Sequence, residues 1–392
     1  MTQSEPTVVL LGIDRLLALQ LARILWRQGR SVVGYAVAPN SHYCRTRAVE
    51  WTAPIEEFLS DPVSCLSSIA EKSGQRPILI PCTDELVWWL STNREQLAEH
   101  ADFLLASPES LERLADKARF CKEAAADGFP LPETRVVANA DELDRAAQEM
   151  VFPIIVKPAR RSPEWMETTN GAKVLKLDRA SDLTEQGSRL LKASPQLVLQ
   201  HWIPGGDDCM YSVLVCLDRD HEPAMPPVVA RKLRQWPLET GVGSLAMQVD
   251  EPALVETTLR LLRSRHYVGT GSLQFKKDAT SGAFLLIEMN TRFSLNFPLC
   301  EASGLEATHI HCLLAAGRSL PSMPRLARPG MKWICWKRDL AAAFTHWRRG
   351  SLSIAGWVRS LAGPKRSADV VLSDPLPTLL DLVRKLRLTS RG

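Results

Sequence analysis

The sequence lacks the features that mark several classes of protein. Its nine cysteines include no C-x-x-C pair, so we expect reduced, buried thiols and neither paired zinc ligands nor a disulfide framework. No apolar stretch approaches the roughly 18 residues that span a bilayer. The apolar run near the N-terminus has no basic region before it, unlike a secretory signal. We therefore expect a cytoplasmic protein.

A dinucleotide-binding fingerprint is also missing. Residues 7–12 are a short apolar run that ends in Gly12, residues 14–29 have helical spacing, and residues 31–37 form a second apolar run. This order predicts strand, helix and strand in a parallel sheet. The turn holds one glycine, whereas the fingerprint needs three. We expect Gly12 to permit a tight turn, and a nicotinamide-dependent oxidoreductase is the less favoured alternative.

The bulk composition is that of a soluble globular protein. The chain has 392 residues, of which 45% are hydrophobic and 23% charged, and its net charge is +4. Because this length exceeds what one core can organise, two or three domains are expected. The mild positive charge requires no nucleic-acid partner, and we expect none. It suits a protein that holds anionic ligands.

A Glu-x-Asn pair stands near the end of an apolar strand, in LLIEMNTR at residues 285–292. Because side chains two apart in a strand share a face, Glu288 and Asn290 should point one way, and Ile287 and Met289 the other. A carboxylate and an amide oxygen side by side suit magnesium. Alone, such a pair is more often a solvated strand end, so the prediction of a metal site depends on the other residues that would surround it.

Cationic residues elsewhere in the sequence support the prediction of a metal and phosphate site. Lys157 ends the apolar strand 153–157, Lys117 lies on a helical pattern, and Arg292 follows the Glu-x-Asn pair. Each alone is an ordinary strand terminator or surface cation. Together with magnesium they form a set that neutralises a triphosphate and a phosphoryl group in transfer. The polar stretch 160–171 could fold over the phosphates and exclude water.

The segment LVLQHWIPGG, residues 197–206, predicts a hinge strand. Its backbone groups could pair with the edge of adenine, while apolar side chains sandwich the ring. Asp208, just after the turn, could accept hydrogen bonds from ribose hydroxyls. A plain strand and turn is the alternative.

The tail from about residue 321 mixes tryptophan with basic residues. Such a mixture can dock on an anionic membrane surface. We favour a helical appendage packed on the core with a solvated basic face, and membrane contact is the alternative. The residues concerned are Trp333, Trp336, Trp347, Trp357, Arg348, Arg349, Lys365, Arg366, Arg384, Lys385 and Arg387.

In their order and spacing, several stretches resemble the ATP-grasp superfamily, and most closely its carboxylate–amine ligases, which include D-aspartate ligase-like enzymes. These stretches are LADKARFCKEAAADGFPLPET, FPIIVKPA, LVLQHWIPGGDD, ARKLRQWPLETGVGS, GTGSLQFKKD and LIEMNTRF. The resemblance implies an α/β and α+β protein, with an ATP-grasp fold after an N-terminal Rossmann-like (pre-ATP-grasp) parallel-sheet domain. The implied domains are 1–112 (N-terminal), 113–200 (ATP-grasp lid), 201–325 (ATP-grasp core with the metal site) and 326–392 (helical, basic, Trp-rich extension).

The resemblance also implies an activity, namely ATP-dependent joining of a carboxylate to an amine through an acyl phosphate. The substrates would be small molecules, with amino acids among the candidates. Many relatives are dimers, but no stretch of this sequence indicates an interface, so the oligomeric state, a homodimer included, stays open. The implied residues are Lys117 and Lys157 for the ATP phosphates, Gln200, Trp202 and Ile203 for adenine, Asp208 for the ribose, Lys232 and Arg234 for phosphates or a substrate carboxylate, Glu288 and Asn290 for magnesium, and Arg292 for the acyl phosphate.

One position departs from the family's pattern. The family places an acidic metal ligand on the strand before Glu-x-Asn, where this sequence has Gln274. Glutamine offers a neutral oxygen and removes one negative charge. Magnesium binding could be weaker, Asp278 or the nucleotide could supply the missing oxygen, or catalysis could be lost. The alternative function is thus a non-catalytic ATP-binding regulatory module.

Overall fold

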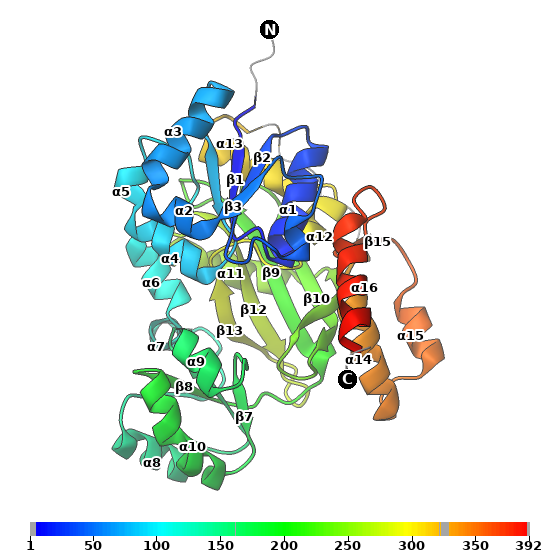
Figure 1. Cartoon of the computed structure of the whole chain (residues 1–392). Coiled ribbons are helices and arrows are strands. Elements are labelled where there is room, and N and C mark those ends of the chain that lie inside the picture. The colour runs from blue at the N-terminus through cyan, green and yellow to red at the C-terminus, as the bar shows by residue number, and fades with distance from the viewer. Residues whose placement is uncertain (1–4, 161, 321, 323–328, 390–392) are drawn as a thin grey trace.

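The computed structural model describes residues 5–160, 162–320, 322 and 329–389, and of residues 385–389 it describes the backbone alone. Within these ranges the strands form three sheets, called A, B and C here. In Figure 1, sheet A and its helices lie at the top, sheet B at the lower left and sheet C in the centre, with the C-terminal helices along the right side.

Sheet A is parallel, with the order β3-β2-β1-β4. Gly12 adopts a φ of 90° after β1, so the chain can turn sharply toward the first helix. The predicted strand–helix–strand start and N-terminal parallel sheet are confirmed. The elements are β1 (Val8–Leu11), α1 (Leu16–Arg27), β2 (Val32–Ala36), η1 (His42–Cys44), β3 (Thr52–Pro54), α2 (Ile55–Ser60), α3 (Pro62–Ser73), β4 (Ile78–Pro81), α4 (Asp84–Thr92) and α5 (Arg94–Leu97).

Sheet B is antiparallel, with the order β5-β8-β6-β7. The stretch 160–171, expected as a polar loop, contains the helix α9, whose Trp165 is fully buried in the core of this unit. Residue 161 lies outside the described residues. The elements here are α6 (Pro108–Ala115), α7 (Lys117–Ala126), β5 (Thr134–Val137), α8 (Ala140–Glu149), β6 (Ile154–Pro158), α9 (Pro163–Thr168), β7 (Leu175–Leu177), α10 (Ala180–Ala193) and β8 (Leu197–His201).

Sheet C has the order β13-β12-β9-β10-β11-β14-β15. Val213 and Phe275 on one face pack with the helix α11, whereas Leu214 and Ala230 on the other face join the core shared with sheet A. The elements are η2 (Asp207–Cys209), β9 (Met210–Leu217), β10 (Val228–Trp236), β11 (Val242–Val249), α11 (Pro252–Ser264), β12 (Gly269–Lys277), β13 (Phe284–Asn290), α12 (Pro298–Ala302), α13 (Ala307–Ala315), β14 (Lys332–Ile334), α14 (Trp336–Arg348), α15 (Ile354–Ser360), β15 (Lys365–Ser367) and α16 (Leu376–Thr389).

The C-terminal segment is more than the helical appendage we expected. Its strands β14 and β15 extend sheet C beyond β11. Trp333 of β14 is fully buried, and its Nε1 donates to Gln20 Oε1 of α1 at 2.8 Å. The segment therefore completes the central sheet.

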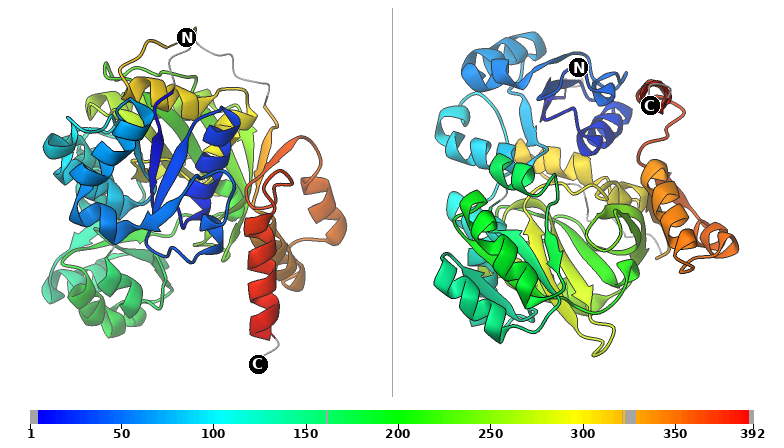
Figure 2. Two further views of the ribbon diagram at one scale, coloured as in Figure 1. Left: turned by 45° about the horizontal axis from the view of Figure 1, so that its top comes forward. Right: turned by 60° about the horizontal axis from the view of Figure 1, so that its bottom comes forward.

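Two buried ion pairs hold this segment to the remainder of the chain. Arg234 of β10 donates to both carboxylate oxygens of Asp339 of α14, at 2.8 and 2.9 Å. Arg23 of α1 donates to Asp374 at 2.8 Å, and Thr46 donates to the same carboxylate at 2.6 Å. Figure 2 shows the C-terminal segment beside α1 in both views. The last part of the chain is thus tied to the first domain.

The predicted domain boundaries fall at different kinds of position. The 112/113 boundary lies inside α6 and the 200/201 boundary inside β8. The 325/326 boundary and the side chains of Lys385 and Arg387 lie outside the described residues. In the described ranges, no helix combines the length and the apolar character that a bilayer span requires.

We predict that Asp339→Ala lowers the free energy of unfolding by about 3–5 kcal/mol, because it leaves the buried Arg234 guanidinium without its counterion. Urea titration followed by circular dichroism measures this loss. The control is Asp381→Ala, which removes a half-exposed pair with Lys337 and should cost less than about 1 kcal/mol. Equal losses in the two variants would contradict the prediction.

Candidate functional site

A cavity of about 280 Å³ lies between sheets B and C, and Lys117 of α7 and the segment after β13 complete its lining. Ten of the twelve residues predicted for the site line this cavity, although they come from α7, from β6, β8, β10, β12 and β13, and from the segments that follow β8 and β13. They are Lys117, Lys157, Gln200, Trp202, Ile203, Lys232, Gln274, Glu288, Asn290 and Arg292. The structure therefore brings most of the predicted set together.

Lys117 and Lys157 reach the cavity from neighbouring elements. The Lys117 N–H donates to the carbonyl of Ala159 at 3.0 Å, which fixes the start of α7 beside the end of β6. Lys157 is 5% exposed, and burial lowers the pKa of its ammonium while the carboxylate of Glu288 opposes that shift. A buried ammonium favours an anionic ligand that restores its lost solvation.

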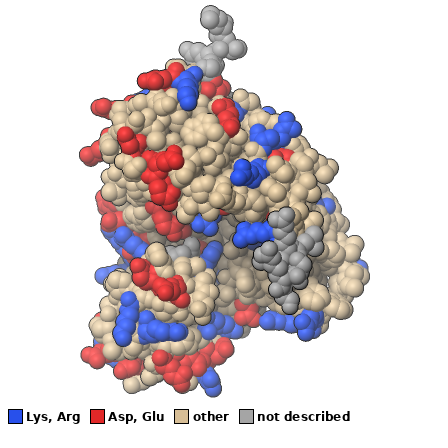
Figure 3. Space-filling view, viewed as in Figure 1, with Lys and Arg blue, Asp and Glu red and all other residues tan. Residues whose placement is uncertain are grey.

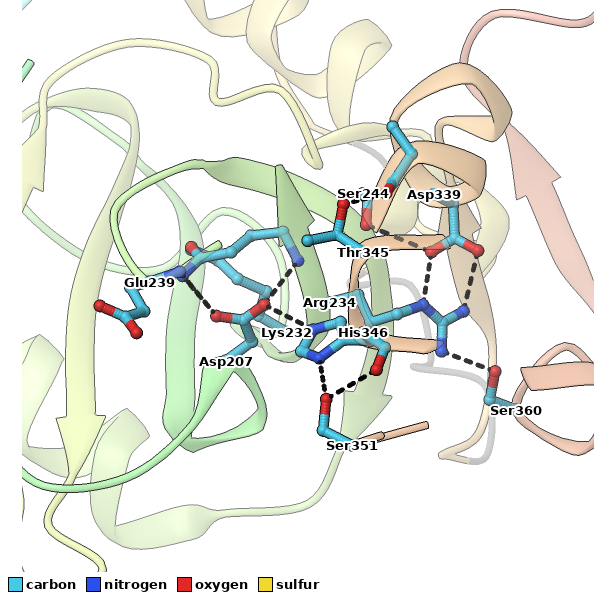
Figure 4. Close-up of polar contacts among 12 residues, drawn as sticks. Asp207, Lys232, Arg234, Glu239, Ser244, Asp339, Thr345, His346, Ser351 and Ser360 are labelled. Carbon is cyan, nitrogen blue, oxygen red and sulfur yellow. Dashed lines mark hydrogen bonds and ion pairs between the residues drawn. The ribbon is translucent and has the colours of Figure 1, made fainter. Parts of the chain in front are cut away.

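A series of hydrogen bonds holds the side chain of Lys232 of β10 in place (Figure 4). Its Nζ donates to Gln235 Oε1 at 2.7 Å, and Gln235 Nε2 donates to Asp207 Oδ1 at 2.7 Å. The other oxygen of Asp207 lies 3.4 Å from His346 Nε2 of α14. Burial lowers the pKa of Lys232 to about 8, and the nearby Asp207 and Glu288 limit the shift. The ammonium is thus held in place and poorly hydrated.

Arg234 does not reach the cavity, because β10 bulges between Lys232 and Gln235. Lys232 pairs with Ala246 and Arg234 with the next residue back, Leu245. Without the bulge, Lys232 and Arg234 would share a face; with it they point to opposite faces. Arg234 consequently meets Asp339 of α14, as Figure 4 shows.

Asp208 also lies outside the cavity. Its carboxylate is about half exposed and pairs with Arg231 at 2.8 Å on the surface of sheet C. The neighbouring Asp207 is the buried one, at 8% exposure, and it supports Gln235. Asp208 therefore does not face the place expected for a ribose.

The predicted metal ligands sit on adjacent strands. Gln274 of β12 is directly opposite Glu288 of β13, and Ser272 is opposite Asn290. Opposed residues on paired strands have Cβ atoms about 5 Å apart. A bulge between Gln274 and Phe275 leaves Ile287 without a partner, so Ile287 lines the cavity. Our expectation that Ile287 shares the opposite face with Met289 is wrong for this reason.

These donors fit magnesium that arrives with a nucleotide. Glu288, Asn290 and Gln274 all offer oxygen, the ligand atom that magnesium prefers. In the described part of the chain no three His, Cys, Asp or Glu side chains gather as a metal cluster. Magnesium commonly uses one or two carboxylates together with substrate phosphates, and the set here matches that pattern. Asp278 caps the β12–β13 turn instead, where it accepts from the N–H of Thr280 at 2.7 Å.

At the far end of the cavity, Trp202 lies between two lysines. Lys176 Nζ is 4.5 Å and Lys276 Nζ 4.0 Å from the centre of its ring. Lys276 is 7% exposed, and burial lowers the pKa of its ammonium. Gln200 is buried, with Nε2 donating to Thr134 Oγ1 at 3.1 Å. This end offers an aromatic ring, apolar Ile203 and positive charge.

Arg292 connects the cavity to the N-terminal domain. Its Nε donates to Asp84 Oδ1 at 2.7 Å, and its Nη1 donates to the carbonyl of Phe293 at 3.0 Å. Asp84 begins α4 just after β4, at the carboxyl end of the parallel sheet. The N-terminal domain therefore holds one of the cavity residues in place, although Asp84 does not itself line the cavity.

Four contributors escaped the sequence analysis, namely Asp84, Asp207, Gln235 and Lys276. Lys276 follows Gln274 by two residues in β12, so the strand rule could have found it. Gln235 depends on the bulge, and Asp207 and Asp84 depend on contacts with distant elements. No local pattern marks those three.

Known proteins that are similar to this chain in sequence include ATP-binding enzymes. Residues 246–323 match the family described as carbamoyl-phosphate synthase L chain, ATP binding domain. The chain is 24% identical over 300 residues to D-aspartate ligase of Enterococcus faecium, which covers 69% of this chain and 70% of that protein. It is 26% identical over 232 residues to the carbamoyl phosphate synthase large chain of Thermomicrobium roseum, which covers 56% of this chain but 20% of that protein.

A solved structure shows the same fold. The biotin carboxylase domain of the 2-oxoglutarate carboxylase from Hydrogenobacter thermophilus, in complex with MgADP and bicarbonate, superimposes with a TM-score of 0.62 at 16% identity. The match covers 83% of this chain and 73% of that one. The fold, the side chains gathered in the cavity and the sequence matches agree, and together they make the chain similar to proteins of the ATP-grasp superfamily and, within it, to a carboxylate–amine ligase.

Proposed function

We propose that this ATP-grasp ligase activates a carboxylate as an acyl phosphate and joins it to an amine, with release of ADP and phosphate. The observation that carries the proposal is the gathering of two lysines, the buried Lys157 and the partly buried Lys232, with Glu288 and Asn290 in the lining of one cavity. Such a cavity favours a polyanion accompanied by a divalent cation.

The proposed reaction has two steps. A carboxylate oxygen attacks the γ-phosphorus of ATP, the bond to the β,γ-bridging oxygen breaks, and ADP leaves with that electron pair. The amine then adds to the acyl carbon, the carbon–oxygen bond to phosphate breaks, and phosphate leaves as the nitrogen loses a proton. The first step turns a poor electrophile into a mixed anhydride.

The residues of the cavity would divide the work. Lys117, Lys157 and Lys232 would bind phosphate oxygens, and Arg292 would stabilise the negative charge that develops on the acyl phosphate. Glu288 and Asn290, with Gln274 beside them, would hold magnesium, which supplies charge neutralisation to the phosphates. Trp202 and Ile203 would contact the adenine ring. The sheet B unit would exclude water.

An amino acid is the substrate class that we favour. Arg292 lines the cavity, with its Nε bound to Asp84, and a guanidinium is the group that recognises a carboxylate. The similarity to D-aspartate ligase supports the same class.

A regulatory module that binds ATP without turnover is the second candidate. Gln274 favours it, because this strand partner of Glu288 supplies no negative charge. A measurement of ATP turnover distinguishes the regulatory module from the ligase.

We predict substrate-dependent release of ADP from MgATP across a panel of amino acids and small carboxylates. Glu288→Gln should lower the rate at least ~100-fold, because it removes the one carboxylate of the metal set. Glu222→Gln is the matched control, since Glu222 pairs with Arg263 on the surface, and it should retain the rate. Tight ATP binding with no ADP release from any combination would instead favour the regulatory module.

The effect of Gln274 on magnesium can be measured directly. We expect Gln274→Glu to lower the magnesium concentration needed for half-maximal ATP binding by about tenfold, because it adds a carboxylate opposite Glu288. Isothermal titration of ATP at several magnesium concentrations tests this. Gln196→Glu, at a position remote from the cavity lining, is the control. An unchanged magnesium requirement in Gln274→Glu would show that Gln274 is not near the metal.

The lowered pKa of Lys232 predicts a pH dependence. The ammonium is charged below about pH 8 and loses its proton above it, so ATP affinity should fall about tenfold from pH 7 to pH 9. Lys232→Arg keeps its charge over this range, and its ATP affinity should fall less steeply, with only the other buried lysines, Lys157 and Lys276, left to lose charge. Equilibrium binding at fixed ionic strength measures both. A flat profile in the unchanged protein would refute the assignment.

A further inference from the structure

Exposed apolar side chains are concentrated at one end of the chain. Of the fifteen large hydrophobic side chains that are exposed in the described ranges, twelve lie between residues 340 and 383. The active-site cavity does not involve them. Scattered single exposures need no explanation, but a concentration of this kind marks a surface that meets another apolar phase.

Helix α14 presents the clearest part of this surface. Its inner side buries Asp339, Ala342 and Ala343 against sheet C. Leu340, Phe344 and Trp347 point away from that side and are 52%, 56% and 52% exposed. At about 100° per residue, the three fall within an arc of about 60°. We call this stripe the α14 apolar face.

Basic residues border the α14 apolar face. Arg348 lies over the ring of Phe344, with Cζ 6.0 Å from the ring centre, and Phe344 lies 5.9 Å from Trp347. Arg349 follows, and both arginines are exposed. Lys337 flanks the other end of the helix, where it pairs with Asp381 of α16. Aromatic and aliphatic side chains beside arginines form the pattern of a helix that lies in a membrane interface.

The charge of the whole segment has the same sign. Residues 331–392 contain twelve Lys and Arg against four Asp and no Glu, whereas residues 1–330 contain 36 Lys and Arg against 40 Asp and Glu. The net charges are therefore +8 and −4. Two of the four aspartates, Asp339 and Asp374, are buried in ion pairs. Figure 3 shows basic side chains beside the C-terminal helices at the lower right.

Neighbouring helices extend the apolar surface. Ile354 and Val358 of α15 are 65% and 58% exposed and lie one turn apart. Leu379 and Val383 of α16 are also exposed one turn apart. Trp357 Nε1 donates to Asp339, which ties α15 to α14. The surface is therefore carried by helices that are fixed to one another.

We propose that the α14 apolar face docks on an anionic lipid bilayer, with Leu340, Phe344 and Trp347 at the acyl boundary and Arg348 and Arg349 at the headgroup phosphates. Charge complementarity selects this occupant, because the segment is strongly positive and the membrane surface is negative. The ion pair between Arg234 and Asp339 joins α14 rigidly to sheet C, so docking fixes the orientation of the cavity relative to the bilayer. This proposal is independent of the proposed function.

A second copy of the chain fits this face less well. A symmetric contact would bring the same patch of both copies together, so Arg348 and Arg349 of both copies would be gathered in one interface. Repulsion between these like charges would oppose the contact. Self-association through this face is nevertheless an outcome that the experiment below detects.

Co-sedimentation of the full chain with vesicles tests the proposal. We expect binding to phosphatidylcholine vesicles that contain phosphatidylglycerol, little binding to phosphatidylcholine alone, and weakening by salt. The double variant Phe344→Ser with Trp347→Ser should weaken partitioning at least ~10-fold. The double variant Arg348→Glu with Arg349→Glu should weaken it at least ~30-fold.

Two controls match these changes in chemistry and exposure. Val151→Ser alters a hydrophobic side chain that is 62% exposed in the sheet B unit, and Arg179→Glu reverses an exposed charge there; both should bind vesicles normally. Thermal melting verifies that each variant is folded. Failure of the unchanged chain to bind anionic vesicles, or equal binding by all variants, would overturn the proposal. Loss of a dimer in the Phe344 and Trp347 variant, without any vesicle binding, would assign the face to a second copy.

Discussion

Removal of ammonium groups from water is the constraint on which the arrangement of the site depends. Lys157 and Lys232 carry charge into a junction of two sheets, where burial lowers the pKa of each. The nearby carboxylates of Glu288 and Asp207 offset this cost in part, because attraction to a carboxylate favours the charged lysine. A polyanionic substrate would offset the part of this desolvation cost that the carboxylates leave uncompensated. The affinity proposed for phosphate would thus depend on the poor solvation of the cavity as much as on its charge.

The site is also supported by residues outside the predicted set. Asp207 and Gln235 hold Lys232, and α14 holds both the bulged end of β10 and Asp207. Arg234, displaced from the cavity by the bulge, is the residue that attaches this helix. The bulge in β10 therefore has two structural effects. It turns Lys232 and Gln235 toward the cavity and gives the C-terminal segment a buried anchor.

The sequence predicted what depends on local pattern. Glu288 and Asn290 two apart in a strand, and Lys157 at the end of another, reach the cavity because period-two alternation survives in those places. Arg234 and Ile287 could not be placed, because each lies at a bulge, and a bulge is decided by the register of the partner strand. Asp208 was chosen in preference to Asp207, since two adjacent aspartates give no sign of which is buried. The strands β14 and β15 were missed because three residues carry too little pattern to indicate a strand.

The place of those two strands has a consequence for biosynthesis. A nascent chain that has emerged as far as residue 296 contains every cavity residue except Trp333, yet β11 still has an open edge and Arg234 still lacks Asp339. An unpaired edge strand invites pairing with other chains. Premature termination before β14 would therefore release a chain that keeps all ten predicted cavity residues but exposes the edge of β11 to other chains.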